Sequence, residues 1–148
     1  MNSSLSTGIY YTDTVVSVNI PSGGYIPLSF DLVPSCTTDI QHSPPDSTIV
    51  LKKGRYFISY MGSIANTVEG QGIILKLMKD GELVPGSRIV DSTVTSSDEV
   101  GKRANISGSI IVELEEEKSN LQFQLISRQT GQSFNVFEFT VNILEVTC

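Results

Sequence analysis

The sequence is poor in the residues that most catalytic and metal sites use. Its 148 residues include no tryptophan, two cysteines and a single histidine, His42. No second histidine can join His42 as a metal ligand or general base, and there is no Gly-x-Ser-x-Gly motif. Because His42 lies in a proline-rich segment beside Asp39 and Asp46, we expect a solvated loop side chain. The sequence therefore predicts a protein that is not an enzyme and has no cofactor and no metal.

Positive charge and long apolar runs are also scarce. The ten Lys and Arg residues are scattered among sixteen Asp and Glu residues, which leaves a net charge of -6. Such a surface repels phosphate, so we expect no nucleic-acid partner. No run reaches the roughly 18 apolar residues that a membrane span needs, and Met1 to Gly8 lack the regions of a secretory signal. We therefore expect no membrane insertion.

What the sequence does contain is repeated alternation of apolar and polar residues, the period of a half-buried β-strand. Asp80-Gly81 between two apolar runs predicts a tight hairpin, and Pro85 predicts an edge or bulged strand after it. Lys52-Lys53-Gly54 predicts a turn. The sequence therefore predicts a single all-β domain over 1–148, a ten-stranded sandwich or jelly roll whose first eight or so residues are disordered. The expected strands are 9–19, 24–32, 48–51, 55–64, 72–79, 83–90, 106–114, 121–126 and 134–146, with a long loop over 33–47.

Several strands also have apolar residues on the face opposite the predicted core. In the last strand, the inner face is assigned to Phe137, Phe139, Val141 and Ile143. An outer sheet face that is apolar as well suggests burial against another subunit. Alternatively, loops or the N-terminal segment with Tyr10 and Tyr11 cover this face within one chain. The candidate subunit-interface residues are Phe57, Met61, Ile111, Phe134, Val136, Leu144 and Val146.

Acidic residues form two groups along the chain. Glu113, Glu115, Glu116 and Glu117 could in principle bind calcium, but they lack the spacing of a dedicated calcium loop. We expect a solvated turn there, one that ends the preceding strand and discourages edge pairing. For the looser group of Asp91, Asp98 and Glu99, we likewise expect a solvated surface.

Three short segments occur in order along the chain: Gly24-Tyr25-Ile26-Pro27-Leu28, then Gly54-Arg55-Tyr56-Phe57-Ile58-Ser59-Tyr60, and then Leu83-Val84-Pro85-Gly86-Ser87 after the hairpin turn. Together with the apolar final strand, they resemble the C-terminal domain of bacterial collagen-like exosporium glycoproteins, a branch of the C1q/TNF superfamily. The resemblance extends from about residue 20 to the end. It implies a ten-stranded jelly roll that assembles as a homotrimer, with the candidate face lining the threefold axis. The 148 residues contain no Gly-X-Y repeat, and the resemblance supplies no ligand site.

The jelly roll also makes a prediction about the two cysteines. If the strand at 24–32 pairs antiparallel with the last strand, as in the jelly roll, Cys36 and Cys148 lie at opposite ends of the sheet. A bridge requires Cα atoms within roughly 7 Å. We therefore expect no intrachain disulfide, while Cys148 could link chains.

The resemblance and the second apolar face together predict the function. The chain is expected to be a non-catalytic, trimerising head of a spore-surface (exosporium) or otherwise extracellular protein, structural and adhesive. The loops at about 33–47, 65–71 and 91–102 are the expected contacts with a host-surface, matrix-protein or glycan ligand. Two alternatives stay open: a carbohydrate- or receptor-binding tip of a phage fibre or lectin-like module, and a soluble cytokine-like signal. A flat aromatic platform would favour the carbohydrate-binding alternative.

Overall fold

The computed structural model of the chain describes residues 5–12, 18–66, 72–91, 103–127 and 133–147. Within them, all regular secondary structure is β-strand. No helix in this part of the chain could span a membrane. The strands are β1 (Thr7–Thr12), β2 (Val18–Pro21), β3 (Phe30–Val33), β4 (Ile40–His42), β5 (Ile49–Asn66), β6 (Ile73–Lys79), β7 (Glu82–Leu83), β8 (Ile89–Asp91), β9 (Ala104–Ile126) and β10 (Ser133–Val146).

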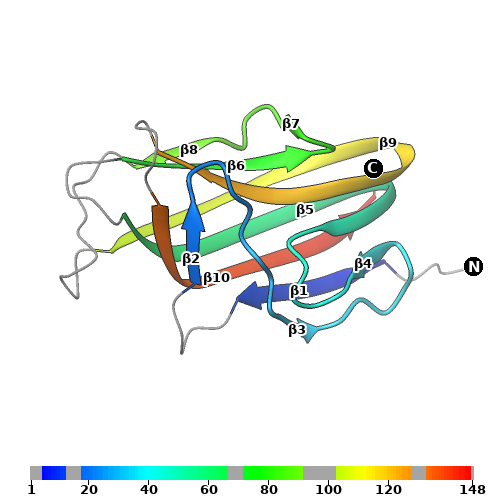
Figure 1. Cartoon of the computed structure of the whole chain (residues 1–148). Helices are drawn as coiled ribbons and strands as arrows, with labels where there is room; N and C mark the ends of the chain where they lie inside the picture. The colour runs from blue at the N-terminus through cyan, green and yellow to red at the C-terminus, as the bar shows by residue number, and fades with distance from the viewer. Residues whose placement is uncertain (1–4, 13–17, 67–71, 92–102, 128–132, 148) are drawn as a thin grey trace, which may run out of the picture.

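The strands form one antiparallel ladder in the order β3-β1-β10-β5-β9-β6-β7, with β2 also on β10, β4 on β5 and β8 on β6. The ladder closes into a sandwich because β9 is long and bends back at its middle (Figure 1). Its first part pairs with β5, and its last part pairs with β6. The segment before β3 runs along the last part of β9, where Ile26 N donates to Phe123 O at 2.9 Å.

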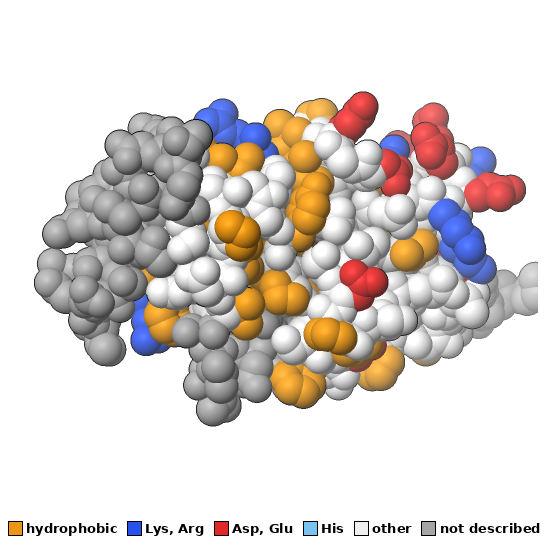
Figure 2. Space-filling view, in the orientation of Figure 1, with side chains coloured by type: hydrophobic (Ala, Val, Ile, Leu, Met, Phe, Trp, Pro, Cys, Tyr) orange, Lys and Arg blue, Asp and Glu red, His pale blue; other side chains and the backbone are white. Residues whose placement is uncertain are grey.

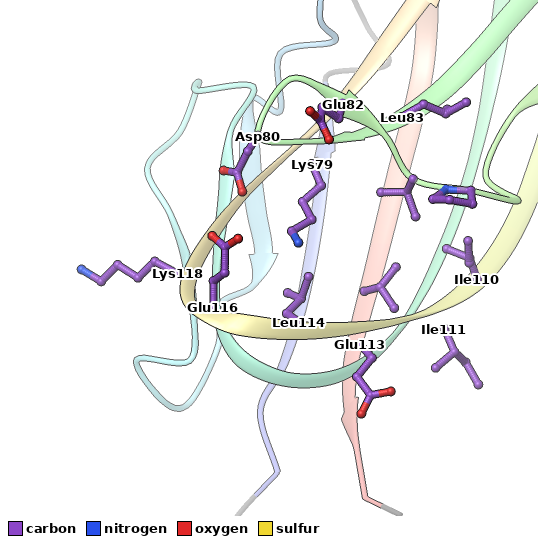
Figure 3. Close-up of a pocket in the computed structure, with 13 residues that line it drawn as sticks. Lys79, Asp80, Glu82, Leu83, Ile110, Ile111, Glu113, Leu114, Glu116 and Lys118 are labelled. Atoms are coloured by element: carbon purple, nitrogen blue, oxygen red, sulfur yellow. The ribbon is translucent and has the colours of Figure 1, made fainter.

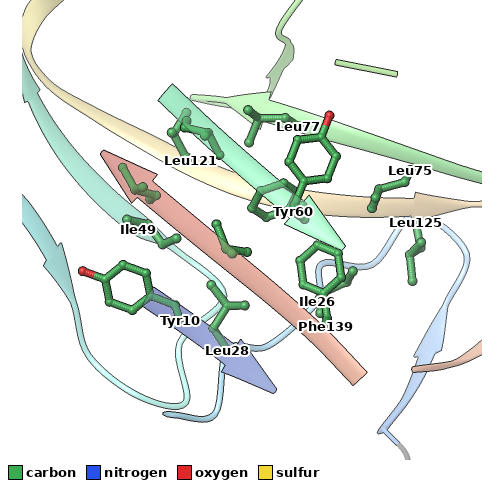
Figure 4. Close-up of a cluster of buried hydrophobic side chains, with 14 of the residues drawn as sticks. Tyr10, Ile26, Leu28, Ile49, Tyr60, Leu75, Leu77, Leu121, Leu125 and Phe139 are labelled. Atoms are coloured by element: carbon green, nitrogen blue, oxygen red, sulfur yellow. The ribbon is translucent and has the colours of Figure 1, made fainter. Parts of the chain in front are cut away.

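The buried side chains form one apolar cluster inside the bent ladder (Figure 4). Three aromatic rings from β5, β9 and β10 contact one another within it. The ring centroids are 5.0 Å apart for Tyr60 and Phe123 and 5.1 Å apart for Phe123 and Phe139. These separations are in the favourable range for tilted and edge-to-face rings. Because each fully buried large apolar side chain contributes about 1.5–3 kcal/mol, this cluster is the main source of stability.

Two of these rings lie opposite glycines on the neighbouring strand. Phe139 pairs with Gly62, and Tyr60 pairs with Gly108. A Cβ atom on Gly62 would lie 2.7 Å from the Phe139 ring and 2.9 Å from Glu138 O. A Cβ atom on Gly108 would lie 2.6 Å from Ile89 and 3.1 Å from the Tyr60 ring. The glycines therefore provide the space that the two rings occupy.

A β-bulge at Phe137 decides which side chains of β10 face the core. The pairing of β10 with β5 shifts between Val136 and Glu138, so Phe137 is the extra residue. Before and after the bulge, the apolar residues therefore point the same way. Phe134 and Val136 are fully buried with Phe139, so their assignment to a subunit interface is wrong. The core assignment of Phe137 is also wrong, because its ring is only partly buried and lies under Arg103, 3.5 Å from the guanidinium carbon.

Two segments that were predicted to interrupt or end strands lie within continuous strands instead. Lys52-Lys53-Gly54 is not a turn but an irregularity within β5, and Glu115–Glu117 lie inside β9 rather than ending a strand. The expected loop over 33–47 contains β4. The predicted strand at 24–32 is regular only from Phe30. The prediction that the first eight or so residues are disordered is wrong for Ser6, which is buried. It is also wrong for Thr7 and Gly8, which pair with β10 as part of β1.

The hairpin and edge-strand predictions are confirmed. Asp80 and Gly81 connect β6 to β7, and both have positive φ, 49° and 83°. Beyond them, Pro85 and Gly86 interrupt the returning strand, which resumes as β8. The apolar pattern of β6 is confirmed as a buried strand, and Phe139, Val141 and Ile143 are buried as predicted.

Substituting Gly62→Ala should lower the free energy of unfolding by about 1–3 kcal/mol, because the added methyl overpacks against a ring and a backbone oxygen. The matched control is Ser63→Ala, on the opposite face of the same strand, which should change stability by less than about 0.5 kcal/mol. Urea denaturation measures both. Equal midpoints for the two variants would contradict this packing.

Candidate self-association face

The outer face of the sheet formed by β1, β10, β5 and the first part of β9 contains an exposed apolar row. Phe57 of β5 pairs with Leu144 of β10 on one side and with Ile111 of β9 on the other. Directly paired residues on one face have adjacent side chains. Leu144 is 43% exposed and Ile111 is 61% exposed, while Phe57 between them is half-buried. The row therefore presents three large apolar side chains to solvent.

A fourth apolar side chain lies farther along the same face. Met61 is 52% exposed and follows Phe57 by four residues, which places both side chains on one side of β5. Small polar residues surround it, so the surface there is hollowed. A depression of about 360 Å³ is lined by Met61, Gly62, Ser63, Asn105, Ile106, Ser107 and Glu138.

At the other end of the face, the apolar row is bordered by charge. Arg55 pairs with Val146 on β10 and with Glu113 on β9, and its Nη2 lies 3.2 Å from Glu113 Oε1. Exposed ion pairs of this kind contribute little to stability, but they select the partner that covers the neighbouring surface. Val146 is half-buried beside this pair. The face is therefore apolar in its middle and polar at both ends.

Of the seven predicted interface residues, five lie on this face: Phe57, Met61, Ile111, Leu144 and Val146. The other two, Phe134 and Val136, belong to the core for the reason given above. The alternative, that the N-terminal segment covers the face within one chain, fails for Tyr10, which is 1% exposed and packs in the core. The side chain of Tyr11 is outside the described part of the structure.

Beneath the end of this face lies a group of polar residues that sequence patterns did not indicate. Ser6 Oγ donates to Asp39 Oδ2 at 3.2 Å and contacts Thr37 Oγ1. Burial and the neighbouring Asp39, through its charge and a hydrogen bond, raise the pKa of Glu145 above its usual value. Burial, together with the charges of Glu145 and Asp39, raises the pKa of Tyr56 to about 12. No residue spacing could have revealed this cluster, because its members come from four distant segments.

His42 does not lie in a solvated loop, so that prediction is wrong. Its side chain is 0% exposed, on β4, and its ring packs edge-on against Tyr10 with centroids 4.9 Å apart. Nδ1 contacts the Asp31 carboxylate, and Nε2 lies 2.6 Å from Asp46 O. Burial, followed by the charge of Asp31, raises the pKa of Tyr10 to about 12.

This geometry leaves His42 without a nitrogen for chemistry. Both ring nitrogens already face oxygen acceptors, and the ring is closed off from solvent. A general base must reach the proton it removes, and a metal ligand needs a free lone pair. His42 is therefore a structural residue that joins β3, β4 and the segment after β4.

The predicted position of Cys36, at the far end of a strand paired with the last strand, is also wrong. β3 pairs with β1 rather than with β10, and β1 lies between them. Cys36 Sγ lies 3.8 Å from Leu5 O, next to Ser6, whose carbonyl accepts from Glu145 N. Cys36 is exposed and lies at the end of the sheet where β10 ends, not at the opposite end. Cys148 is outside the described residues, so the expected absence of a bridge stays a prediction without its original reason.

Comparisons with known proteins agree with the fold. No protein-family model and no curated protein matches the chain. Among solved structures, it is similar to Eiger TNF from S. frugiperda (TM-score 0.66, 8% identity, 97% of this chain and 93% of that chain). It is also similar to the globular domain of zebrafish complement 1qA, with a TM-score of 0.56 and 10% identity over 93% of this chain and 94% of that chain. The TM-score to PRD1 vertex protein P5 is 0.51, with 16% identity over 96% of this chain and 97% of that chain. The chain therefore has the C1q/TNF-like jelly-roll fold.

Glu145→Gln should make the chain more stable at neutral pH and leave it nearly unchanged in acid. The folded-state pKa of Glu145 is raised, so the folded state binds this proton more readily than the unfolded state. The protonated Glu145 side chain therefore stabilises the folded state fully at pH values below the usual carboxyl pKa. This stabilisation is lost as pH rises through the raised folded-state pKa. Melting temperatures of wild type and variant should converge toward pH 4, whereas parallel curves across all pH values would refute the assignment.

His42→Phe should keep the ring packing but leave the Asp31 carboxylate without its partner. An unsatisfied buried group costs about 1–3 kcal/mol, and more when charged, so the variant should be destabilised by at least this amount. The double variant His42→Phe with Asp31→Leu should recover much of the loss, because no charge is then stranded. Denaturation of the two variants tests the pair, and a double variant no more stable than the single one argues against it.

Proposed function

We propose that the chain is a non-catalytic head that self-associates through the outer face of β1, β10, β5 and β9. The observation that supports this most strongly is the exposed row of Leu144, Phe57 and Ile111, with Met61 beyond it. The buried core cluster does not include any of these four residues. Contiguous exposed apolar residues mark interaction sites in stable proteins.

A closed homotrimer is the assembly we infer. The jelly roll of C1q and TNF domains is shared by this chain, and the resemblance to collagen-like exosporium proteins implies three subunits around this same sheet. A face that closes on copies of itself forms a ring of limited size. Three heads in a ring would also present three copies of each surface loop, which raises avidity for a host-surface or matrix ligand.

Placement on a spore surface is the finer part of the proposal. It is supported by the segments at 24–28, 54–60 and 83–87 that resemble the exosporium family. An extracellular role fits the fold of the similar structures, since a sandwich head with polar loops suits display at the end of a fibrous protein. Of the three predicted contact loops, the one at 33–47 is described in full. It contains β4 and His42. Residues 67–71 and 92–102 of the others are outside the described ranges.

The carbohydrate-binding alternative is less well supported. A sugar platform needs a flat exposed aromatic surface. Of the aromatic side chains that the structure describes, Phe30 is the exposed one, at 44%. Tyr10, Tyr56, Tyr60, Phe123, Phe134 and Phe139 are buried in the core. The likeness to a vertex protein concerns the fold and does not favour this alternative.

Met61→Glu and Ile111→Glu should each dissociate the assembly without unfolding the chain, because both side chains are more than half exposed. Placing a charge in a subunit contact costs several kcal/mol, enough to shift association by about a hundredfold or more. Sedimentation velocity measures the size, and circular dichroism checks the fold. Val90→Glu, an exposed apolar residue on β8 at 41%, is the matched control and should leave the size unchanged. Unchanged size in all three variants would refute this face.

A further inference from the structure

Titratable side chains attach the segment 33–47 to the sandwich at two points. At the first point, Asp39 of the segment meets Glu145 of β10, and at the second, His42 of the segment meets Asp31 of β3. Four acidic residues of the described ranges are not exposed: Asp31, Asp39, Asp91 and Glu145. Three of these four therefore lie where the segment is attached.

Other carboxyl groups of the molecule are surrounded by water. Acidic side chains project from the surface in the space-filling view (Figure 2). In the groove between β9 and the β6–β7 hairpin, Asp80, Glu82 and Glu116 are all exposed (Figure 3). Water solvates the charge of an exposed carboxylate, whereas a sheltered charge needs a partner in the protein. The sheltered groups are therefore the ones whose protonation can change how a segment is held.

At the first point, one hydrogen bond joins two carboxyl groups. The side chains of Glu145 and Asp39 are hydrogen-bonded to each other, and Ser6 Oγ donates to Asp39 Oδ2 at 3.2 Å. Two ionised carboxylates have no hydrogen between them, so one of the two must carry a proton. Asp39 already accepts from Ser6, and burial, followed by the charge of Asp39, raises the pKa of Glu145. The proton is therefore assigned to Glu145.

Among the described residues, no ion pair neutralises these two carboxyl groups. The ammonium group of Lys52 donates to Thr38 Oγ1 at 2.9 Å instead. Tyr56 of β5 lies close to both carboxyl groups, but burial and their charges raise its pKa to about 12, so it stays neutral near pH 7. When Glu145 loses its proton, two negative charges are therefore left side by side between the segment and β10.

At the second point, the His42 ring needs a hydrogen on each side. Nε2 lies 2.6 Å from Asp46 O, a carbonyl oxygen that can only accept, so Nε2 must donate. Nδ1 contacts the Asp31 carboxyl group, and this contact needs a second hydrogen, on the ring or on the carboxyl group. The pair therefore holds one proton more than a neutral imidazole beside a carboxylate.

The other neighbours of His42 do not replace this proton. On β1, Tyr10 packs against the ring, and burial, followed by the charge of Asp31, raises the pKa of Tyr10 to about 12. The Asp46 carboxylate accepts from Thr48 N at 3.1 Å. On β5, the residue paired with His42 is the apolar Ile49. Loss of the extra proton therefore breaks one of the two ring contacts.

We propose that these two protons hold the segment 33–47 against the sandwich, so that the segment is closed in mild acid and loosens as the pH rises above neutral. The sign is the same at both points, because the closed segment binds protons that an open segment releases. A solvated carboxyl group releases its proton in the acidic range, and a solvated imidazole does so between about pH 5 and 8. The consequence for a ligand rests on the proposed function, in which 33–47 is a contact loop, whereas the proton-dependent attachment does not.

Hydrogen exchange of individual amides in the intact chain, corrected for the intrinsic rate at each pH, tests the proposal. Two amides report on the attachment, since Lys52 N donates to Asp39 O and Leu28 N donates to Asp46 O. Their protection should fall about tenfold or more between about pH 5.5 and about pH 8. Leu125 N, which donates to Gly24 O in the other sheet, is the internal control and should keep its protection.

Two results of this measurement would overturn the proposal. Unchanged protection of Lys52 N and Leu28 N would show that the segment is held equally at both pH values. An equal loss at Leu125 N would show that the whole domain is destabilised rather than one segment. Sedimentation velocity should give the same assembly size at both pH values. Dissociation at the higher pH would assign the effect to the self-association face and would likewise contradict the proposal.

The variant Glu145→Gln tests the first point. Its amide can donate to Asp39 at every pH, so Lys52 N should stay protected at about pH 8. The matched control, Glu117→Gln, removes the same charge from an exposed position on β9 and should respond to pH as the wild type does. If Glu145→Gln also responds as the wild type does, the Glu145 proton does not hold the segment.

The double variant His42→Phe with Asp31→Leu tests the second point. It removes both members of the pair and with them the extra proton, so the protection of Leu28 N should no longer depend on pH. A pH dependence equal to that of the wild type would show that this pair does not hold the segment. Because protection is compared within each variant between two pH values, a general change in stability does not produce the expected result.

Discussion

The pairing of β5 with β10 on one side and β9 on the other is the constraint on which the rest of the structure depends. Side chains alternate across a strand, so these two registers decide which residues enter the core and which face solvent. They place Tyr60 opposite Gly108 and Phe139 opposite Gly62, which makes room for both rings. The same registers bring Leu144, Phe57 and Ile111 into one row on the outer face. Core packing and candidate interface are therefore two consequences of one pairing.

The bulge at Phe137 is the local departure that keeps this arrangement consistent. Without it, β10 would turn either its first or its second half away from the core. With it, Phe134 and Val136 join Phe139, Val141 and Ile143 inside. Arg103 then covers the displaced Phe137 ring, a contact worth about 0.5–1 kcal/mol at an exposed site. Bulges are common where a strand must re-aim its side chains, and here one insertion shifts two residues from interface to core.

The sequence predicts most of the architecture because alternation and turn chemistry are local signals. The all-β class, the buried face of β6, and the Asp80-Gly81 hairpin follow from them directly. Five of the seven candidate interface residues also lie where alternation along a strand places them. Irregularities within strands were not predictable, because the bulge at Phe137 and the continuity of β9 through Glu115–Glu117 depend on the partner strand.

Contacts between distant segments were the second source of error. The buried His42 ring contacts the Asp31 carboxylate and the carbonyl of Asp46. The prolines next to His42 in the sequence predict only a loop, so they give no sign of these contacts. The place of Cys36 depended on which strand lies beside β10, and β1 rather than β3 occupies that position.

The account depends most on whether the exposed row on the outer face is covered by other copies of the chain. Sedimentation equilibrium of the unmodified protein at micromolar concentration tests this most directly, because it gives the mass of the assembly without reference to shape. The account predicts one species with the mass of three chains, which persists on dilution. A single species with the mass of one chain would contradict it, and the apolar row would then need another explanation.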